Sequence, residues 1–159
     1  MKALSLRPFW ADYVAFEGKT IECRSWQTSY RGDLLICASS RRESGFICGK
    51  ALCVVELTEI EPFTFRHLDD AGMEPDEMPD KPSFAWHLGN QRWIEPFAVK
   101  GKLHLFDVDD ELIHVLPAVE TDAQYEQAVR EHYLPHVYFA KDDDEAREWW
   151  GERAGCVVE

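Results

Sequence analysis

The 159-residue sequence has no run of about 18 apolar residues and no leader in which charged residues precede an apolar stretch. A membrane-spanning helix needs about 20 apolar residues, and a secretory signal needs such a leader. We therefore expect neither, and we predict a cytoplasmic protein without a membrane partner. Hydrophobic residues make up 45% of the chain, which is enough for one core, and no repeat or long linker divides it.

The patterns typical of metal and cofactor sites are also missing. The five cysteines are odd in number and form no C-x-x-C pair, so neither a disulfide framework nor a zinc ribbon is indicated. His132 and His136 have the spacing of a helical metal site, but Pro135 interrupts the helix. No Gly-rich phosphate-binding motif occurs. We predict no cofactor, no metal, and reduced thiols at the cysteines with apolar neighbours, Cys23, Cys37, Cys48 and Cys53.

Negative charge predominates, because 30 Asp and Glu outnumber 17 Lys and Arg and give a net charge of -13. Such a charge repels nucleic acids, whose phosphates supply most non-specific affinity. The distribution is uneven: residues 1–60 hold eight Lys and Arg against seven Asp and Glu, and residues 61–159 hold nine against 23. The first part can therefore carry a local basic patch, while the acidic surface serves solubility or binds a protein partner.

Alternating polar and apolar residues predict a series of short strands, with one aromatic helix between Pro8 and Gly18. The acidic, proline-containing segment 64–82 is predicted to be a loop, and residues 89–91 a turn or bulge. The strands are expected at 2–7, 19–26, 34–38, 50–57, 84–88, 92–97 and 103–106.

The pattern changes to helical after residue 110. Thr121 and Gln124 form a capping box that predicts a helix to about Tyr133. Asp142 and Glu145 predict a second helix that ends at Gly151. We expect the tryptophans near its end, Trp149 and Trp150, to pack it on the sheet.

Residues 18–26, Gly-Lys-Thr-Ile-Glu-Cys-Arg-Ser-Trp, resemble the signature of the ASCH domain, the homology region named after activating signal cointegrator 1. That signature reads G-x-K-x-x-E-x-R, and Lys19, Glu22 and Arg24 have its spacing. The Arg31-Gly32 turn follows, as it does in the family. Gly18 departs from the pattern, because it directly precedes Lys19 instead of lying two residues before it.

The resemblance implies an α+β fold of the PUA-like superfamily: a mixed β-barrel or sheet with flanking helices. It covers residues 2–107, and we expect residues 108–159 to form a helical C-terminal extension packed on the same domain. The number of strands expected from the sequence permits this fold. A fold alone does not determine a function.

ASCH domains are thought to bind RNA or other nucleic acids, so the resemblance implies RNA, a nucleoside or single-stranded DNA as the partner. Binding needs cations for phosphates and flat rings for unpaired bases. By strand alternation Glu22, Arg24 and Trp26 share a face, and Lys19 reaches it only from a bulge or from the strand mouth beside Gly18. The predicted binding residues are Lys19, Arg24, Trp26, Arg31, Arg41, Arg42 and Trp86, with Trp93 as a further aromatic plane.

The resemblance also suggests an enzyme. Some small bacterial ASCH proteins are amidohydrolases that deacetylate 4-acetylcytidine, and others are reported as ribonucleases. The amidohydrolase pattern implies a lysine base at Lys19, a threonine nucleophile three residues later, and a downstream glutamate. Glu22 stands where that threonine is expected, and Thr20 cannot simply be assumed to take over the role of the nucleophile. Hydrolysis with Lys19 and Glu22 as an acid/base pair is therefore the alternative function.

Overall fold

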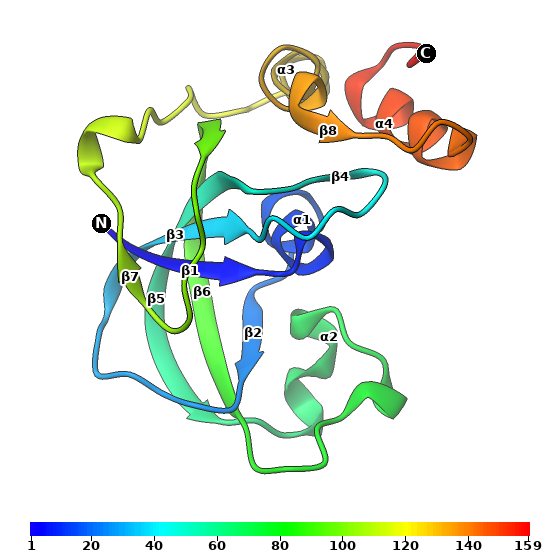
Figure 1. Ribbon diagram of the computed structural model, residues 1–159. Coiled ribbons are helices and arrows are strands. Elements are labelled where there is room, and N and C mark those ends of the chain that lie inside the picture. The colour runs from blue at the N-terminus through cyan, green and yellow to red at the C-terminus, as the bar shows by residue number, and fades with distance from the viewer.

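The computed structural model describes all 159 residues and contains a six-stranded mixed sheet with helices around it (Figure 1). The strand order is β2-β6-β5-β3-β1-β7. β1 runs parallel to β3, and the other neighbours in the sheet are antiparallel. The strands are β1 (Lys2–Leu6), β2 (Ile21–Arg24), β3 (Gly32–Ala38), β5 (Lys50–Pro62), β6 (Phe84–Ala98) and β7 (Phe106–Asp107).

The fold is α+β and PUA-like, as predicted, but the sheet does not close into a barrel. β2 forms one edge and β7 the other. A second, two-stranded sheet pairs β4 (Phe46–Ile47) with β8 (Val137–Tyr138). No helix is both long enough and apolar enough to cross a bilayer.

Helix α1 (Pro8–Phe16) covers the middle of the large sheet. Pro8 lies in its first turn, where a missing backbone N–H costs nothing. Its apolar face is buried on β3 and β5, and its Ala11, Val14 and Ala15 belong to the largest core cluster. Gly18 follows the helix with φ +71°, a left-handed conformation that turns the chain directly into β2.

Strands β5 and β6 are longer than predicted, and the expected turn at 89–91 is a bulge inside one continuous strand. The pairing register shifts between Val54 and Glu56, where β6 contains one extra residue. Asn90 occupies the bulge with φ +46°. An asparagine tolerates this conformation better than most residues, so the chain continues as a strand instead of reversing.

Two other segments differ in the structure from what the sequence predicts. Segment 64–82 is not only a loop, because it contains α2 (Leu68–Ala71) between two 3-10 turns. The strand predicted at 103–106 is reduced to β7, since His104 has φ +59° and Leu103 is 89% exposed. Gly101 lies against β1: a Cβ there would come within 2.5 Å of the Ser5 hydroxyl oxygen. Residues 99–105 therefore form a loop packed on β1.

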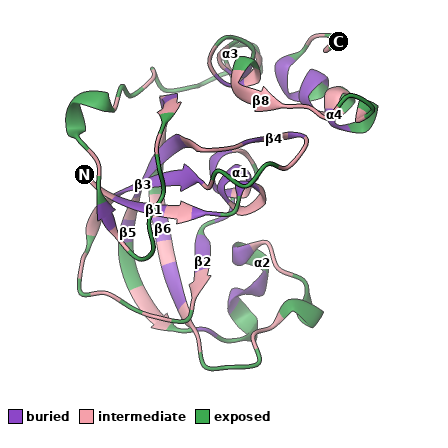
Figure 2. Cartoon of the chain, viewed as in Figure 1, coloured by how far each residue is buried: buried purple, intermediate pink, exposed green.

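The C-terminal helices complete the main core (Figure 2). α3 (Asp122–Ala128) is capped by Thr121, as predicted, and continues as a π-helical turn over Val129–Tyr133. α4 (Asp144–Ala154) begins one residue later than predicted, with Asp143 as its cap. It passes through Gly151 and is capped by Gly155, so the predicted end at Gly151 is wrong. Four residues of these elements, Val129, Tyr133, Trp150 and Ala154, are fully buried.

The candidate nucleic-acid interface

Lys19 lies at the mouth of β2, between the end of α1 and the strand. Its backbone N–H donates to the Tyr13 carbonyl, which places the side chain on the side of the strand that bears Glu22. Its Nζ is 3.4 Å from Glu22 Oε1, donates to the Ala71 carbonyl at 2.6 Å, and lies 4.6 Å from the centre of the Trp10 ring. The position beside Gly18 thus brings the lysine and the glutamate together.

Glu22 connects the buried lysine to Arg24. Its second oxygen, Oε2, accepts a hydrogen bond from Arg24 Nη1 at 3.2 Å. Exposure rises along the series: the Lys19 side chain is 1% exposed, Glu22 6% and Arg24 27%. The Arg24 guanidinium also lies 5.8 Å from the Trp26 ring. Arg24 is therefore the part of this triplet that solvent and a ligand can reach.

Burial lowers the pKa of Lys19, although the Glu22 carboxylate opposes the shift. Removing an ammonium group from water disfavours its charged form. A lower pKa increases the fraction of lysine that is neutral, and the neutral amine can accept a proton. Here three groups surround the nitrogen, so its proton is shielded from solvent as well.

The other predicted binding residues lie outside this triplet. Arg31 donates to the Thr28 and Tyr30 carbonyls, Arg41 pairs with Glu43, and Arg42 lies over the Tyr138 ring. All three arginines are exposed, and no ion pair or hydrogen bond connects them to Lys19, Glu22 or Arg24. They can contribute charge to the surface but not to one closed site.

Trp86 has no exposed surface, so its ring has no face for a base. It is the strand partner of Glu22 on β6, and its indole N–H donates to the Trp26 carbonyl at 3.2 Å. Its ring packs edge-on against Trp26, with 4.8 Å between centroids. Trp86 is therefore a support for Trp26, and the half-buried Trp26 is the aromatic ring beside Arg24.

The structure adds residues that sequence reasoning missed. The loop at 99–105 lies beside Trp26, because the His104 ring is 4.8 Å from the Trp26 ring. Two exposed lysines, Lys100 and Lys102, are carried by the same loop. Arg7, at the start of α1, shares the Glu43 carboxylate with Arg41. The Lys-Gly-Lys sequence at 100–102 is a usable sequence signal for a basic turn. No sequence signal, however, indicates that this turn lies close to Trp26.

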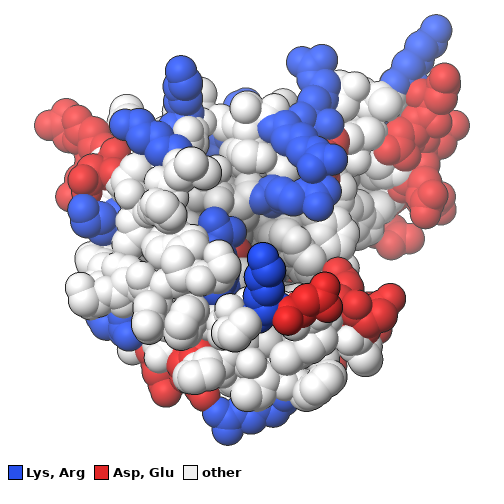
Figure 3. Space-filling model, turned by 60° about the horizontal axis from the view of Figure 1, so that its bottom comes forward, with Lys and Arg blue, Asp and Glu red and all other residues white.

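The face that carries β2 and α2 comes forward in Figure 3. Lys and Arg side chains gather along its upper part and around its middle, whereas Asp and Glu gather mainly towards the right. The acidic net charge of the chain is thus not spread evenly over the surface. A local basic region exists despite the total of -13.

One cluster, Glu61 with His67 and His87, has the composition of a metal site. His87 Nε2 is 2.7 Å from Glu61 Oε2, and His67 Nε2 is 3.5 Å from Oε1. The backbone N–H of Thr64, however, donates to His67 Nδ1, which leaves the proton of the neutral ring on Nε2, the atom that faces Glu61. Arg66 also binds Glu61. This geometry fits a hydrogen-bonded network better than a metal site.

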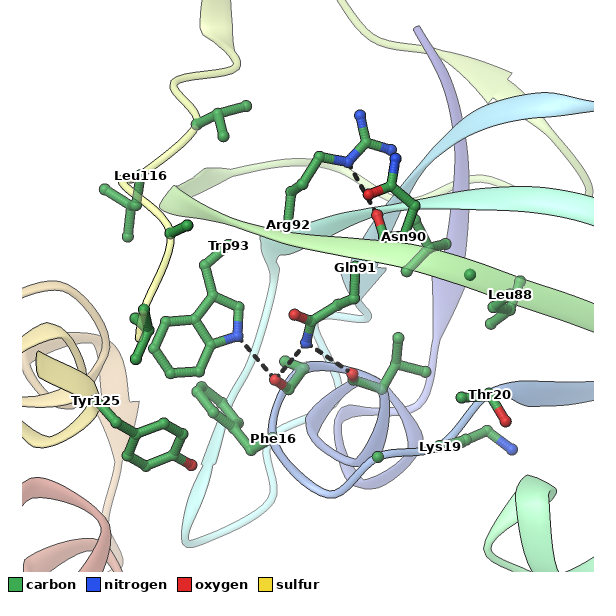
Figure 4. A pocket seen from close by; sticks show the side chains of 18 of the residues that line it. Phe16, Lys19, Thr20, Leu88, Asn90, Gln91, Arg92, Trp93, Leu116 and Tyr125 are labelled. Carbon is green, nitrogen blue, oxygen red and sulfur yellow. Dashed lines mark hydrogen bonds between the residues drawn. The ribbon is translucent and has the colours of Figure 1, made fainter. Parts of the chain in front are cut away.

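A pocket of about 750 Å³ lies beside the α1–β2 connection, away from Glu22 and Arg24 (Figure 4). The end of α1, the bulge of β6, the segment 115–119 and Tyr125 of α3 form its walls. Lys19 and Thr20 line its margin, but the Lys19 ammonium binds Ala71 and points away from the labelled pocket residues. Sequence reasoning missed this pocket, although it named Trp93 as an aromatic plane.

The open mixed sheet with its helix-lined α1–β2 corner is a PUA-like architecture, a class whose members generally bind RNA. The family model of the ASCH domain matches residues 4–157. The chain belongs to the ASCH domain family. No curated protein matches the sequence.

Solved structures agree on the fold. The ASCH protein from Zymomonas mobilis is 15% identical to this chain, with a TM-score of 0.54, and the match covers 69% of this chain and 88% of that one. Two single-residue variants of that protein match with identities of 15% and 16% and TM-scores of 0.55 and 0.56. These matches cover 69% of this chain and 91% and 89% of the respective variants.

Proposed function

We propose that this protein binds single-stranded RNA, or a modified nucleoside, through Arg24 and Trp26. One observation carries the proposal: a partly exposed guanidinium at the end of β2 is held by a buried carboxylate and lies beside the half-buried indole ring of Trp26, two residues past the strand. The Glu22 carboxylate fixes the guanidinium, so little side-chain entropy is lost when it binds a phosphate or a base edge.

The chemistry of the ligand follows from the two groups. A guanidinium offers paired N–H donors that match phosphate oxygens and base edges. An indole face stacks on an unpaired base, which contributes about 1–3 kcal/mol per base. Lys100 and Lys102, on the loop beside Trp26, add cations that a phosphate backbone can follow.

The test measures binding of a labelled single-stranded RNA and the matching DNA at several salt concentrations. Arg24→Ala is expected to weaken RNA binding about tenfold and to reduce the slope of log K against log salt by about one. Arg147→Ala is the matched control, because Arg147 is 18% exposed, pairs with Asp144 and lies 5.2 Å from the Phe139 ring. Equal losses in both variants, or no binding by the wild type, would reject the proposal; the second result would favour a protein partner.

A hydrolase is the second candidate, because the pKa of Lys19 is lowered next to Glu22. In this reaction neutral Lys19 would take a proton from water as the water attacks the acetyl carbonyl of 4-acetylcytidine, and it would return the proton to N4 as the bond between N4 and the acetyl carbon breaks, giving cytidine and acetate. In the ribonuclease-like form it would take the proton of a ribose 2'-hydroxyl, whose oxygen attacks the adjacent phosphorus while the bond to the 5'-oxygen breaks and that oxygen takes the proton. The test incubates the protein with each substrate and follows products by mass, beside Lys19→Ala and Glu22→Ala. Product formation that both variants abolish supports an enzyme, and intact substrates reject one.

A further inference from the structure

The 750 Å³ pocket beside α1 contains no free charge. Arg92 lines it, but both of its terminal nitrogens bind Asp33, at 3.1 and 2.7 Å. Lys19 also lines it, but its ammonium is used by Ala71 and Glu22. An anion such as a phosphate would therefore find no unpaired cation, and the pocket suits an uncharged ligand.

Its walls are mainly apolar and its base is aromatic. Trp93 contacts Phe16 and Tyr125, with ring centroids 5.4 and 5.1 Å apart. Trp93 is only partly buried, so part of its ring remains open to the pocket. Ligand pockets in proteins commonly have volumes of about 300–1,000 Å³. A flat molecule of the size of a nucleoside fits these dimensions and this lining.

Polar groups gather on one side, and Gln91 is the best defined of them. Its Nε2 donates to the Val14 and Ala15 carbonyls at 3.1 and 2.6 Å, at the end of α1 (Figure 4). Both N–H groups are thereby used, and the orientation of the amide is fixed. Its oxygen, which has no hydrogen-bond partner in the protein, is turned to the side of Trp93 and can act only as an acceptor.

Two further polar side chains at the pocket are uncommitted. The Thr20 hydroxyl and the Asn90 amide are exposed and make no side-chain hydrogen bond within the protein. Asn90 projects from the bulge of β6, where its left-handed backbone holds it at the pocket margin. A ligand edge with both donors and acceptors can therefore be satisfied here.

We propose that this pocket binds an uncharged, planar heterocycle that donates an N–H to Gln91, namely an unpaired nucleobase stacked near Trp93. The identification of the heterocycle as a nucleobase rests on the proposed function. The base is supplied either by a free nucleoside or by the RNA held at Arg24. The shared chemistry is the base itself, because nothing in the pocket binds phosphate.

The test uses a bulky side chain placed on the wall of the pocket that segment 115–119 forms. Val119 lines the pocket and is 36% exposed, so Val119→Trp is expected to fill it without disturbing the core. Val115→Trp, at a 56% exposed pocket residue, is a second filling variant. Val157→Trp is the matched control, because Val157 is 88% exposed and does not line this pocket. Circular dichroism checks that every variant folds.

Calorimetry measures binding of adenosine, guanosine, cytidine and uridine at millimolar concentration, and a labelled single-stranded RNA is tested in parallel. We expect at least one nucleoside to bind the wild type and Val157→Trp equally. We expect both filling variants to lose about tenfold or more of that affinity. Arg147→Ala, which lies on α4 and does not line the pocket, is expected to leave nucleoside binding unchanged.

Failure of the pocket and failure of the proposed function give different results. If the wild type binds RNA through Arg24 but binds no nucleoside, or if the filling and control variants bind nucleosides alike, the pocket proposal is overturned and the proposed function stands. If nucleosides bind and the filling variants block them while RNA is not retained, the pocket is a site for a free base and the RNA proposal fails. Loss of RNA affinity in the filling variants as well would identify the strand as the source of the base.

Discussion

Two buried ion-pair systems on either side of α1 differ in how completely they are enclosed. At one, Arg153 of α4 binds Asp12 through two bonds of 2.8 Å, with Glu17 at 2.6 Å as a second partner. Phe16, Trp149 and Trp150 surround the guanidinium, with ring centroids within 4.7 Å. At the other, Lys19 and Glu22 meet at 3.4 Å and extend to the half-open Arg24.

This difference separates a structural ion pair from the proposed binding site. Burial lowers the pKa of Arg153, but the hydrogen bonds and charges of Asp12 and Glu17 outweigh it, so the net pKa is raised and the group stays charged. Nothing remains for a ligand to bind. In the triplet the pKa of Lys19 is lowered, and Arg24 keeps donors that face solvent. The proposed RNA binding needs such hydrogen-bond donors that the protein leaves unused, and the enclosed pair offers none.

The largest effect is expected from breaking the enclosed pair. Arg153→Ala leaves Asp12 buried without a partner, which should cost about 3–5 kcal/mol in the free energy of unfolding. Urea denaturation measures the loss, and the exposed Arg130→Ala serves as a control although it removes a bond to the Ala154 carbonyl. A loss below about 1 kcal/mol would show that the enclosed pair stabilises the fold no more than a surface ion pair does, and the comparison with the triplet would fail.

A smaller loss is expected at the triplet. Glu22→Ala removes the counter-charge of Lys19, but the lysine keeps its bond to the Ala71 carbonyl and can also lose its proton. We expect a cost of about 2 kcal/mol. Glu59→Ala, at an exposed glutamate without an ion pair, should be nearly neutral in the same denaturation experiment. A Glu22 effect larger than that of Arg153→Ala would reverse the comparison.

The lowered pKa of Lys19 predicts that the stability of the protein depends on pH in the alkaline range. Between its folded-state pKa and 10.5, Lys19 carries fewer protons in the folded than in the unfolded protein. The free energy of unfolding of the wild type should therefore rise with pH in this window, relative to Lys19→Met. The two proteins are compared by urea denaturation at several alkaline pH values. Parallel curves would mean that burial does not perturb this lysine.

The smallest change in stability is expected at Arg24, where the largest change in RNA binding is expected. Its side chain is 27% exposed, so Arg24→Ala should change the free energy of unfolding by less than about 1 kcal/mol. The denaturation midpoints of this variant and the wild type check it. A strong destabilisation would mean that Arg24 supports the fold, and its effect on RNA could then not be assigned to the interface.

Part of this organisation could be predicted from the sequence. The common face of Glu22 and Arg24 follows from strand alternation. The strand predicted over 19–26 ends at Arg24, however, so Trp26 lies in a bend and its place beside Arg24 does not follow from alternation. The meeting of Lys19 with Glu22 depends on the left-handed Gly18, which the sequence allowed but did not require. Alternation also cannot say which face of a strand is covered, and for that reason Trp86 could not be distinguished from Trp26 as a stacking ring.

The other features of the fold depend on residues far apart in the chain, so no local sequence pattern predicts them. The pocket is built from the β6 bulge, the segment 115–119 and Tyr125, which meet only in the folded chain. Asp12 and Arg153 are 141 residues apart. Gly151 was predicted to end a helix, but it lies inside α4, and Gly155 is the C-cap. The glycine is needed because the chain returns over it after the helix: a Cβ would come within 2.6 Å of the Cys156 carbonyl oxygen.

The same 141-residue separation has a consequence for how the protein is made. During synthesis Asp12 emerges long before Arg153, and until then its carboxylate and the aromatic surface around Phe16 stay exposed to water. The N-terminal strands can collapse while the ribosome is still translating, but the core is complete only after α4 has left it. We therefore expect the final folding step to follow the synthesis of α4 and to be limited by closure of this long loop.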